Sequence, residues 1–432
     1  MILLRHDRLG DATLKGKTLQ LIVHKGTSEI GGTCIELYEN GSRILLDLGM
    51  PLKEGSEPVD VRDLKPDAVL VSHSHQDHYG LLEDLDEGIP VYISELSMDL
   101  INATRVFRHL QTLKKNFRFF GPWVPFEVSP FTVTPYLVDH SAPNSFAFLV
   151  EAGGARLFYS GDFRAHGRKG VLFERLIQEP LSDIDVLLME GTMLQRSDGG
   201  FPDESAVEEV MVETLERGRN ASFLVCSSQN IDRIVSAFRA CKRTGKTLVV
   251  DVYTAWVLEQ MKLVSESVPN MFWDEVKVIV PHSQYKVVKE NPEFFGDFKE
   301  DLFRSEQRVL PEALKSSPEE YLQVIRVSGA RLISRYISDE PVNIIYSQWL
   351  GYLEEEGQRM YGVEELNKLR EDPRVNFIYA HTSGHAVLED LKRFAHALGP
   401  KMLIPIHTEY PGEFEQHFDN VIVLEDGQEL VV

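Results

Sequence analysis

The sequence contains few cysteines and no long apolar run. Its three cysteines, Cys34, Cys226 and Cys241, lie far apart among 432 residues and form no Cys-x-x-Cys pair. This spacing argues against a disulfide framework and against a zinc site made of thiolates. The opening run Met1-Ile-Leu-Leu gives way to charged residues, so it predicts neither a signal peptide nor a membrane span. We therefore expect a cytoplasmic protein with reduced cysteines and no membrane partner.

Positive charge is also scarce. The chain has 45 Lys and Arg residues against 67 Asp and Glu residues, which gives a formal net charge of −22. This balance disfavours indiscriminate adhesion to nucleic acid or to an anionic membrane, because the average field repels phosphate. A phosphate substrate is still allowed, since bound cations and local basic side chains set the field within a cleft.

A dense group of histidines follows a short apolar run. Residues 68–71 predict a buried strand, and His73, His75, Asp77 and His78 come directly after it. His73 and His75 are two residues apart, so in an extended backbone they project to the same side and can hold one metal ion. Asp77 and His78 then fall on the following turn, where they can face a second ion, as in two-metal hydrolytic sites.

Other candidate ligands also lie at predicted strand ends. Strands are expected at 131–138, 155–159, 184–189 and 402–406, and they lead into His140, Asp162, Glu190 and His407. A single histidine at a strand end is more often structural than ligating. The shared placement favours a site, because loops beyond strand ends are where functional residues gather.

Counting these ligands indicates a catalytic site with two divalent metal ions. His73, His75 and His140 provide three nitrogens for one ion, while Asp77, His78, Asp162 and His407 serve a second, with Asp162 as the bridge. Three protein ligands and an open position are typical of catalytic zinc. Imidazole and carboxylate suit zinc, with manganese as the alternative. Water between two such ions would have its pKa lowered from about 15.7 to about 7.

The order of predicted elements changes near residue 195. Earlier residues predict short strands separated by turns, at 19–23, 33–38 and 43–46. Later residues predict alternating helices and strands, typical of a parallel sheet covered by helices, at 203–217, 222–226, 231–244 and 247–251. From residue 376 the first pattern returns, with strands at 377–380, 402–406, 421–424 and 429–432. The simplest architecture is one domain made of residues 1–194 and 376–432, with residues 195–375 inserted.

Three features have two interpretations each. Asp47 could orient a ligating histidine or cap a turn. The predicted helix 95–113 ends in basic residues interleaved with phenylalanines, which could follow a nucleic-acid backbone or form an ordinary solvated face. Ser227 and Ser228 lie where a strand meets a helix, so they could hold a phosphate or cap the helix.

The histidine motif and the insertion resemble a known family. The set His73-x-His75-x-Asp77-His78, His140 and Asp162 is similar to the metallo-β-lactamase fold. The insertion between Glu190 and His381-Thr-Ser-Gly-His385, followed by Pro405-Ile-His407, resembles the β-CASP branch, nearest to ribonuclease J. The resemblance implies an α/β fold: an αββα metallo-β-lactamase sandwich with an inserted β-CASP domain of βαβ type.

The same resemblance implies a function and roles for residues. The expected reaction is hydrolysis of phosphodiester bonds in single-stranded RNA by a metal-bound hydroxide, in the cleft between the two domains. Glu190 would support His385, which would help to bind the scissile phosphate and protonate the leaving oxygen. His381 and Ser383 would add hydrogen bonds to phosphate, while Asp77 and Asp162 would be catalytic as well as ligating. A homodimer is the expected assembly.

Other functions on the same core are a DNA nuclease, a small-molecule hydrolase of lactonase or thioesterase type, and a regulatory module without turnover. The insertion and His385 favour the nuclease, because a lactonase needs neither. The complete ligand set favours retained chemistry over a purely regulatory role.

Overall fold

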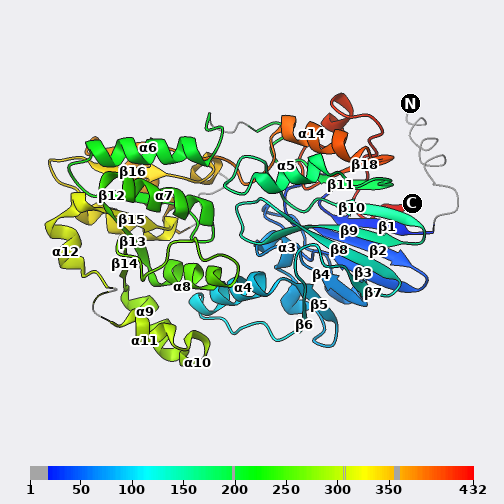
Figure 1. Cartoon of the computed structure of the whole chain (residues 1–432), viewed down its shortest axis with the longest axis horizontal. Helices are drawn as coiled ribbons and strands as arrows, with labels where there is room; N and C mark the ends of the chain where they lie inside the picture. The colour runs from blue at the N-terminus through cyan, green and yellow to red at the C-terminus, as the bar shows by residue number, and fades with distance from the viewer. Residues whose placement is uncertain (1–17, 197–199, 305, 307, 355–360) are drawn as a thin grey trace. The chain divides into compact units, whose positions relative to one another are not determined.

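The chain folds into two compact units, which a computed structural model describes for residues 18–196, 200–304, 306, 308–354 and 361–432 (Figure 1). Unit 1 combines three stretches of chain, Met1–Met98, Leu113–Ser197 and Gly384–Val432. Unit 2 combines Asp99–Thr112 and Asp198–Ser383.

The first sheet of unit 1 has seven strands in the order β19-β1-β2-β3-β4-β5-β6. β1, β2 and β3 form the expected antiparallel meander, and β4, β5 and β6 join it in parallel. Parallel neighbours need crossover connections, which are provided by α2, α3 with the short helix η1, and α4. The bounds are β1 (Gln20–Lys25), β2 (Cys34–Glu39), β3 (Ser42–Leu46), α2 (Val61–Leu64), β4 (Ala68–Leu70), α3 (Gln76–Tyr79), η1 (Leu82–Asp84), β5 (Pro90–Ile93), α4 (Glu95–Phe107), β6 (Asn116–Phe119) and β19 (Glu429–Val431).

The second sheet of unit 1 has six strands in the order β18-β11-β10-β9-β8-β7. Its bounds are β7 (Phe126–Val128), β8 (Phe131–Val138), β9 (Ser145–Ala152), β10 (Ala155–Tyr159), β11 (Val186–Glu190) and β18 (Met402–Ile406). Apolar side chains of both sheets, such as Leu21, Ile35, Phe148 and Val150, form one buried cluster, so the two sheets pack face to face.

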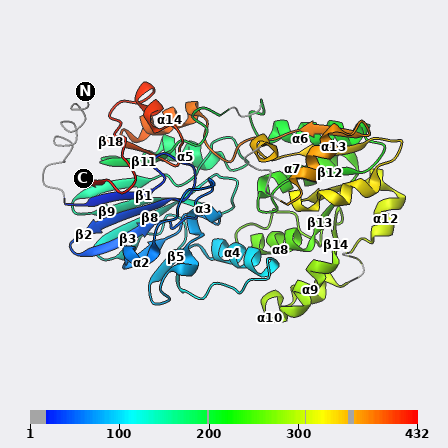
Figure 2. The same cartoon turned by 180° about the vertical axis from the view of Figure 1, so that it is seen from behind.

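Helices α5 (Val171–Gln178) and α14 (Leu388–Leu398) cover the other face of the second sheet. Phe173 of α5 and Phe394 of α14 belong to a second buried cluster together with Phe158 of β10. Late residues therefore complete both sheets: β18 pairs with β11, and β19 pairs with β1 beside the C-terminus (Figure 2). This sandwich of sheets with outer helices confirms the expected fold class.

Unit 2 is built on a parallel six-stranded sheet in the order β14-β13-β15-β12-β16-β17. Its strands are β12 (Ser222–Val225), β13 (Thr247–Asp251), β14 (Val276–Ile279), β15 (Tyr321–Ile325), β16 (Val342–Tyr346) and β17 (Val375–Tyr379). Its helices are α6 (Glu204–Arg217), α7 (Ile231–Thr244), α8 (Val252–Gln260), η2 (Met261–Leu263), α9 (His282–Glu290), α10 (Pro292–Phe295), α11 (Phe298–Leu302), α12 (Pro311–Ser316), η4 (Pro318–Glu320), η5 (Val327–Tyr336), η6 (Leu350–Leu353) and α13 (Val363–Glu371). The alternation of helices and parallel strands is the predicted βαβ pattern.

The units divide the chain at positions that differ from the expected 194/195 and 375/376. The structure divides it at 197/198 and 383/384, because β17 hydrogen-bonds to β16 in the sheet of unit 2. A strand followed by histidines gives the same sequence pattern in either unit. The prediction from the sequence therefore placed β17 in the first domain, whereas it belongs to the sheet of unit 2. Residues 99–112 also group with unit 2, although they were expected in the first domain.

Two element predictions were wrong. α4 ends at Phe107 instead of continuing to residue 113, and His109 then adopts a left-handed backbone with φ of 59°. Residues 421–424 form only an isolated bridge, between Leu403 and Val421, in place of a strand.

The cysteines are buried and unpaired, as expected. Within the described residues, no helix combines the length and the apolar character needed to cross a bilayer.

Candidate metal centre

The end of β4 delivers four candidate ligands to one edge of unit 1. β4 ends at Leu70, the chain bends at Ser74 and His75, and the single-turn helix α3 then carries Asp77 and His78. Gly49 allows this turn to lie against β3, since a Cβ atom there would be 1.7 Å from the carbonyl oxygen of Asp77. His73 and His78 are fully buried, whereas His75 is partly exposed.

The first predicted ligand set comes together. The ligand atoms of His73, His75, His140 and Asp162 all lie within 4.8 Å of one another. The ring centroids of His73 and His140 are 4.8 Å apart, and His140 Nε2 is 3.1 Å from His75 Nδ1. Three imidazoles from two sheets thus face one small volume, as the strand-end argument predicted.

The second set also comes together, with Asp162 common to both. Ligand atoms of Asp77, His78, Asp162 and His407 lie within 4.8 Å of one another. Asp162 Oδ2 is 3.2 Å from His78 Nε2 and 3.7 Å from His73 Nε2. One carboxylate therefore lies between the two sets, which is where a bridging ligand would have to be.

The donor atoms fit divalent cations. His73 Nε2, His78 Nε2 and Asp162 Oδ2 are buried, and none of them has a hydrogen-bond partner among the described residues. Buried polar atoms without partners are costly, and a bound cation would satisfy all three at once. The cluster is therefore compatible with divalent metal binding.

Burial and neighbouring charges set the protonation of these groups. Burial, reinforced by the neighbouring histidines, lowers the pKa of His73 and of His140 well below the ordinary value, which keeps both imidazoles neutral and able to bind a metal. Burial raises the pKa of Asp77, but His78 and His407 outweigh it and lower that pKa to about 2. Burial also lowers the pKa of His78, but Asp162, Asp47 and Asp77 outweigh it and raise that pKa well above the usual range.

The outer nitrogens of the histidines are held by polar groups that leave the inner nitrogens facing the cluster. His78 Nδ1 lies 2.7 Å from Asp47 Oδ2, and His140 Nδ1 lies 2.6 Å from the Gly384 carbonyl oxygen. His407 Nδ1 lies 2.9 Å from Thr192 Oγ1. Such bonds fix the tautomer of a ligating imidazole. Of the two interpretations of Asp47, the structure agrees with the one in which it orients a histidine.

Sequence reasoning missed several of these supporting groups. Ser72 Oγ lies 3.0 Å from His73 Nδ1, and Thr192 and Tyr159 complete other contacts of the site. Ser72 precedes the motif directly, so its position was a usable signal. Tyr159 ends a buried apolar strand and offered none.

Glu190 and His385 form a pair next to the cluster. Glu190 is fully buried, and its Oε1 accepts the backbone N–H of Phe163 at 2.9 Å. Its Oε2 lies 2.9 Å from His385 Nδ1, and His385 Nδ1 is 3.8 Å from Asp162 Oδ2. Burial lowers the pKa of His385, but Glu190 and Asp162 outweigh it and raise that pKa to about 9.

The remaining predicted phosphate-binding residues lie in unit 2, whereas the ligand sets lie in unit 1. Ser228 is buried and accepts a hydrogen bond from Thr254 Oγ1 at 2.8 Å, while Ser227 is exposed. Neither caps α7, because that role belongs to the Asn230 side chain, which accepts the N–H of Arg233. His381 Nδ1 is 3.3 Å from Arg233 Nη1, and Ser383 is buried. Phosphate binding by these residues stays a prediction.

The basic and aromatic residues around α4 take part in local structure. Arg105 donates to the Gln111 carbonyl at 2.7 Å, and Lys115 donates to the Glu83 carbonyl at 3.1 Å. Phe107 packs edge to face on Tyr253, with ring centroids 5.1 Å apart. Arg105, Lys115 and Phe107 therefore have partners within the protein, and their positions are explained without a bound nucleic acid.

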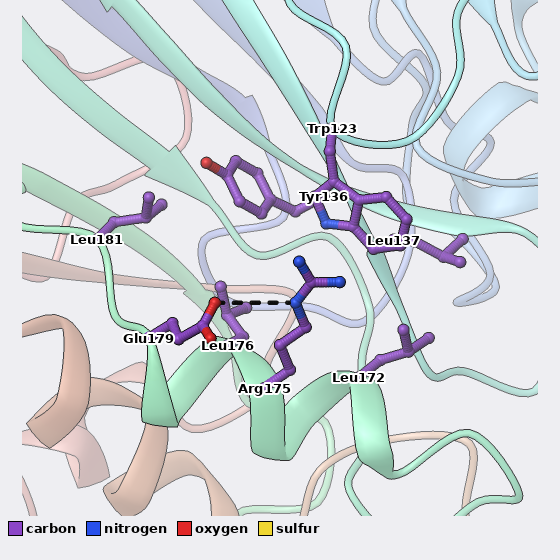
Figure 3. A pocket seen from close by; sticks show the side chains of 8 residues that line it. All are labelled: Trp123, Tyr136, Leu137, Leu172, Arg175, Leu176, Glu179 and Leu181. Carbon is purple, nitrogen blue, oxygen red and sulfur yellow. Dashed lines mark ion pairs between the residues drawn. The ribbon is translucent and has the colours of Figure 1, made fainter.

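A hollow of about 200 Å³ on the α5 face of unit 1 is lined by none of the ligand candidates (Figure 3). The Arg175 guanidinium lies 5.2 Å from the ring centroid of Trp123, and its Nε is 3.9 Å from Glu179. Both charged side chains thus have partners within the hollow.

Comparison with known proteins gives a family match that lies mostly in unit 1. A family model described as a beta-lactamase superfamily domain matches residues 42–223. Among solved structures, the crystal structure of a protein of unknown function from Enterococcus faecalis V583 superposes with a TM-score of 0.75. That similarity covers 96% of this chain and 100% of the other at 19% identity, so it shows the fold alone.

Curated relatives extend the similarity along the chain. Ribonuclease J of Helicobacter pylori (strain B128) is 22% identical over 446 residues, which cover 94% of this chain and 60% of that protein. An RNase J-like protein of Methanocaldococcus jannaschii is 25% identical over 289 residues, which cover 64% of this chain and 66% of that protein. This chain thus spans about 60% of the length of the Helicobacter pylori relatives. These comparisons confirm the resemblance drawn from the motifs: the chain carries a beta-lactamase superfamily domain and is similar over most of its length to proteins named ribonuclease J, consistent with the β-CASP branch of the metallo-β-lactamase fold.

Proposed function

We propose that this chain is a metal-dependent ribonuclease that hydrolyses phosphodiester bonds in single-stranded RNA. The observation that carries the proposal is the convergence of imidazole and carboxylate side chains in unit 1, where His73 Nε2, His78 Nε2 and Asp162 Oδ2 are buried without a hydrogen-bond partner among the described residues. The names of the relatives support RNA as the substrate. When bound, divalent cations neutralise charge on the phosphate and lower the pKa of water from about 15.7 to about 7.

Two overlapping ligand sets would hold two cations, most simply zinc. His73, His75 and His140 form one set, and Asp77, His78, Asp162 and His407 form the other. The position of Asp162 Oδ2, between His73 and His78, supports its role as the bridge. The outer hydrogen bonds from Asp47, Gly384 and Thr192 would keep the histidines in the ligating tautomer.

Glu190 and His385 would handle the proton of the leaving group. Glu190 is fixed by the N–H groups of Phe163 and Thr192, so its Oε2 holds His385 through Nδ1. This arrangement leaves Nε2 of His385 to donate a proton to the leaving oxygen. The raised pKa, caused by the two neighbouring carboxylates against the effect of burial, keeps that proton in place at neutral pH. General acid catalysis of this kind typically contributes about 10²- to 10⁴-fold to a rate.

The test combines a digest of labelled single-stranded RNA with metal analysis of the same protein preparations. We expect His75→Ala and Asp162→Asn to abolish hydrolysis and to reduce bound metal. His385→Ala should remove most hydrolysis while leaving the metal content nearly unchanged. His396→Ala serves as the control, because His396 is an exposed residue of α14.

Loss of metal in His385→Ala would contradict the division between ligands and proton donor. Cleavage of a lactone or of DNA in preference to RNA would overturn the proposed substrate. The zinc assignment, with manganese as the alternative, is checked by elemental analysis, and the expected homodimer by sedimentation equilibrium.

A further inference from the structure

Strand β6 is the last strand of the first sheet of unit 1, so one of its edges has no neighbouring strand in the described part of the chain (Figure 1). Phe117 and Phe119 lie two residues apart and therefore share one face of this strand. Their ring centroids are 6.5 Å apart, and the ring planes are inclined by 9°. Phe119 is 52% exposed. β6 thus carries a stacked aromatic pair at the edge of the sheet, and one ring of the pair is open to solvent.

Two exposed cations accompany this aromatic pair. Lys114 precedes β6, and Arg118 lies between the two phenylalanines. Neither side chain forms a hydrogen bond or an ion pair with any residue that the structure describes. Lys115, in contrast, donates to the carbonyl oxygens of Glu83 and Leu85. Carboxylates are plentiful in a chain with a net charge of −22, so two basic side chains without one remain available to an anionic ligand.

Protection of the sheet edge explains only part of this arrangement. Charged side chains on an edge strand hinder its pairing with a strand of another chain, which would account for Lys114 and Arg118. It does not account for Phe119, because an exposed apolar ring on an edge strand favours association. A ligand with both planar rings and negative charge would use the aromatic ring and the cations together.

β6 ends at the same edge of the sheet as the candidate metal centre. β4, β5 and β6 are parallel, so their carboxyl ends lie together, and ligands of parallel sheets bind outside these ends. Tyr92 pairs with Leu70 on one side and with Arg118 on the other. Phe119 lies one residue beyond this row, and His73 lies three residues beyond it. Two strand spacings, about 10 Å, separate β6 from β4.

We propose that β6 binds the single-stranded RNA substrate beside the metal centre, with a base stacked on Phe119 and phosphates contacted by Arg118 and Lys114. This inference rests on the proposed ribonuclease function. Every base has a flat face that can stack on an aromatic ring, so the contact tolerates any sequence. Arg118 projects from the face opposite Phe119, and RNA that follows the free edge can reach both faces.

The pairing of bases decides whether RNA can use this surface. A base within a duplex is stacked on both faces by its neighbours, whereas a base of a single strand can turn out and stack on a side chain. The Phe119 ring therefore favours unpaired RNA, while Arg118 and Lys114 contact the phosphates of either form.

The test is fluorescence anisotropy of a labelled dodecanucleotide of uridine, titrated with the full chain in an Asp162→Asn background that keeps the RNA intact. Phe119→Leu retains an apolar side chain without a ring, and it should weaken binding at least about fivefold, the lower end of what one stacked base contributes. Phe119→Trp should bind at least as tightly as the parent, because indole also stacks. Phe272→Leu changes another exposed phenylalanine, in unit 2, and should bind like the parent.

The salt dependence of binding tests the cation separately. Arg118→Gln should reduce the slope of log affinity against log salt by about 0.7 for the phosphate contact that it loses. Arg175→Gln removes an exposed cation of α5 and should leave this slope unchanged. Duplex RNA should respond to Arg118→Gln but not to Phe119→Leu.

The proposal is overturned if the parent does not bind the dodecanucleotide saturably, or if Phe119→Leu and Arg118→Gln bind it like the parent while circular dichroism shows native folding. Hydrolysis is measured with Asp162 restored, where Phe119→Leu should raise KM more than it changes kcat. Absence of hydrolysis together with RNA binding that depends on Phe119 counts against the ribonuclease alone. Hydrolysis whose KM is unaffected by Phe119→Leu counts against the β6 site alone.

Discussion

At the scale of single residues, Asp47 connects histidines of both proposed metal positions. Its Oδ2 contacts His78 Nδ1 at 2.7 Å and accepts from Ser72 Oγ at 2.8 Å, and Tyr159 donates to the same oxygen at 2.5 Å. Ser72 in turn contacts His73 Nδ1. One fully buried carboxylate therefore orients an imidazole of each ligand set.

Asp47→Asn should weaken metal binding without unfolding the protein. The amide has nearly the same shape, but it replaces one acceptor oxygen with a donor that His78 Nδ1–H cannot use. Loss of such an outer partner typically reduces metal affinity about 10- to 100-fold. Competition with a coloured chelator measures the change. Asp63→Asn, at an exposed site on α2, is the control, and equal affinities in the two variants would contradict the role given to Asp47.

Gly49→Ala should destabilise unit 1. A Cβ atom at this position would lie 1.7 Å from the Asp77 carbonyl oxygen and 2.9 Å from the Thr33 nitrogen, so the turn carrying Asp77 must move. Overpacking of this kind typically costs about 1–3 kcal/mol of unfolding free energy. Urea unfolding measures it against Gly121→Ala, where a Cβ atom meets nothing within 4 Å. Equal urea midpoints for the two variants would show that the turn accommodates the added Cβ atom without loss of stability.

At the scale of elements, one buried ion pair ties together α6, α7 and the end of β16 in unit 2. Arg233 is fully buried, and its guanidinium donates to Glu204 at 3.1 Å through both Nε and Nη2. It also donates to the carbonyl oxygens of Ser347 and Thr382. Glu204, Ser347 and Thr382 come from three different stretches of chain.

Arg233→Met should cost about 3–5 kcal/mol of unfolding free energy, because it breaks a buried ion pair by removing one partner while the Glu204 carboxylate stays buried. Replacing both Arg233 and Glu204 by methionine should cost less than the single change, since the buried carboxylate is then removed too. Arg239→Met, on the exposed side of the same helix, should cost at most about 1 kcal/mol. Denaturant melts of the three variants and the wild type give these differences, and a double variant less stable than Arg233→Met would contradict the explanation.

The sequence predicted elements well where hydrophobic periodicity was strong. The strands after residue 19, the βαβ alternation and the strand before His73 were all located, because apolar runs bounded by turns have few alternative structures. It failed at α4, where helix formers continue beyond Phe107 but the chain turns into β6. β17 was assigned to the wrong unit because strand pairing depends on distant residues.

The site was predictable for a different reason. His73, His75, Asp77 and His78 lie within six positions, a pattern that few other structures produce, and the distant candidate ligands shared the signature of a polar residue after a buried strand. The orienting groups Ser72, Thr192 and Tyr159 have ordinary sequence surroundings. Their roles follow only from the tertiary contacts of unit 1.

At the scale of the whole molecule, the ligand sets join both sheets of unit 1, so bound cations should stabilise the fold. A cation that binds only the native state at about 1,000 times its Kd adds about 4 kcal/mol. We expect a chelator to lower the thermal midpoint and added zinc to restore it. The thermal midpoint of His407→Ala should change less on chelation and on addition of zinc, because this variant lacks one candidate ligand of the second set. An unchanged midpoint in the wild type after complete removal of metal would contradict this coupling.

The discontinuity of unit 1 has a consequence during protein synthesis. His385, His407 and the strands β18 and β19 follow unit 2 in the chain, so the ribosome adds them after residues 198–383. A nascent chain therefore lacks both the proposed proton donor and one candidate ligand while unit 2 is being synthesised. A nuclease assembled in this order would stay inert beside its own messenger RNA while unit 2 is being translated.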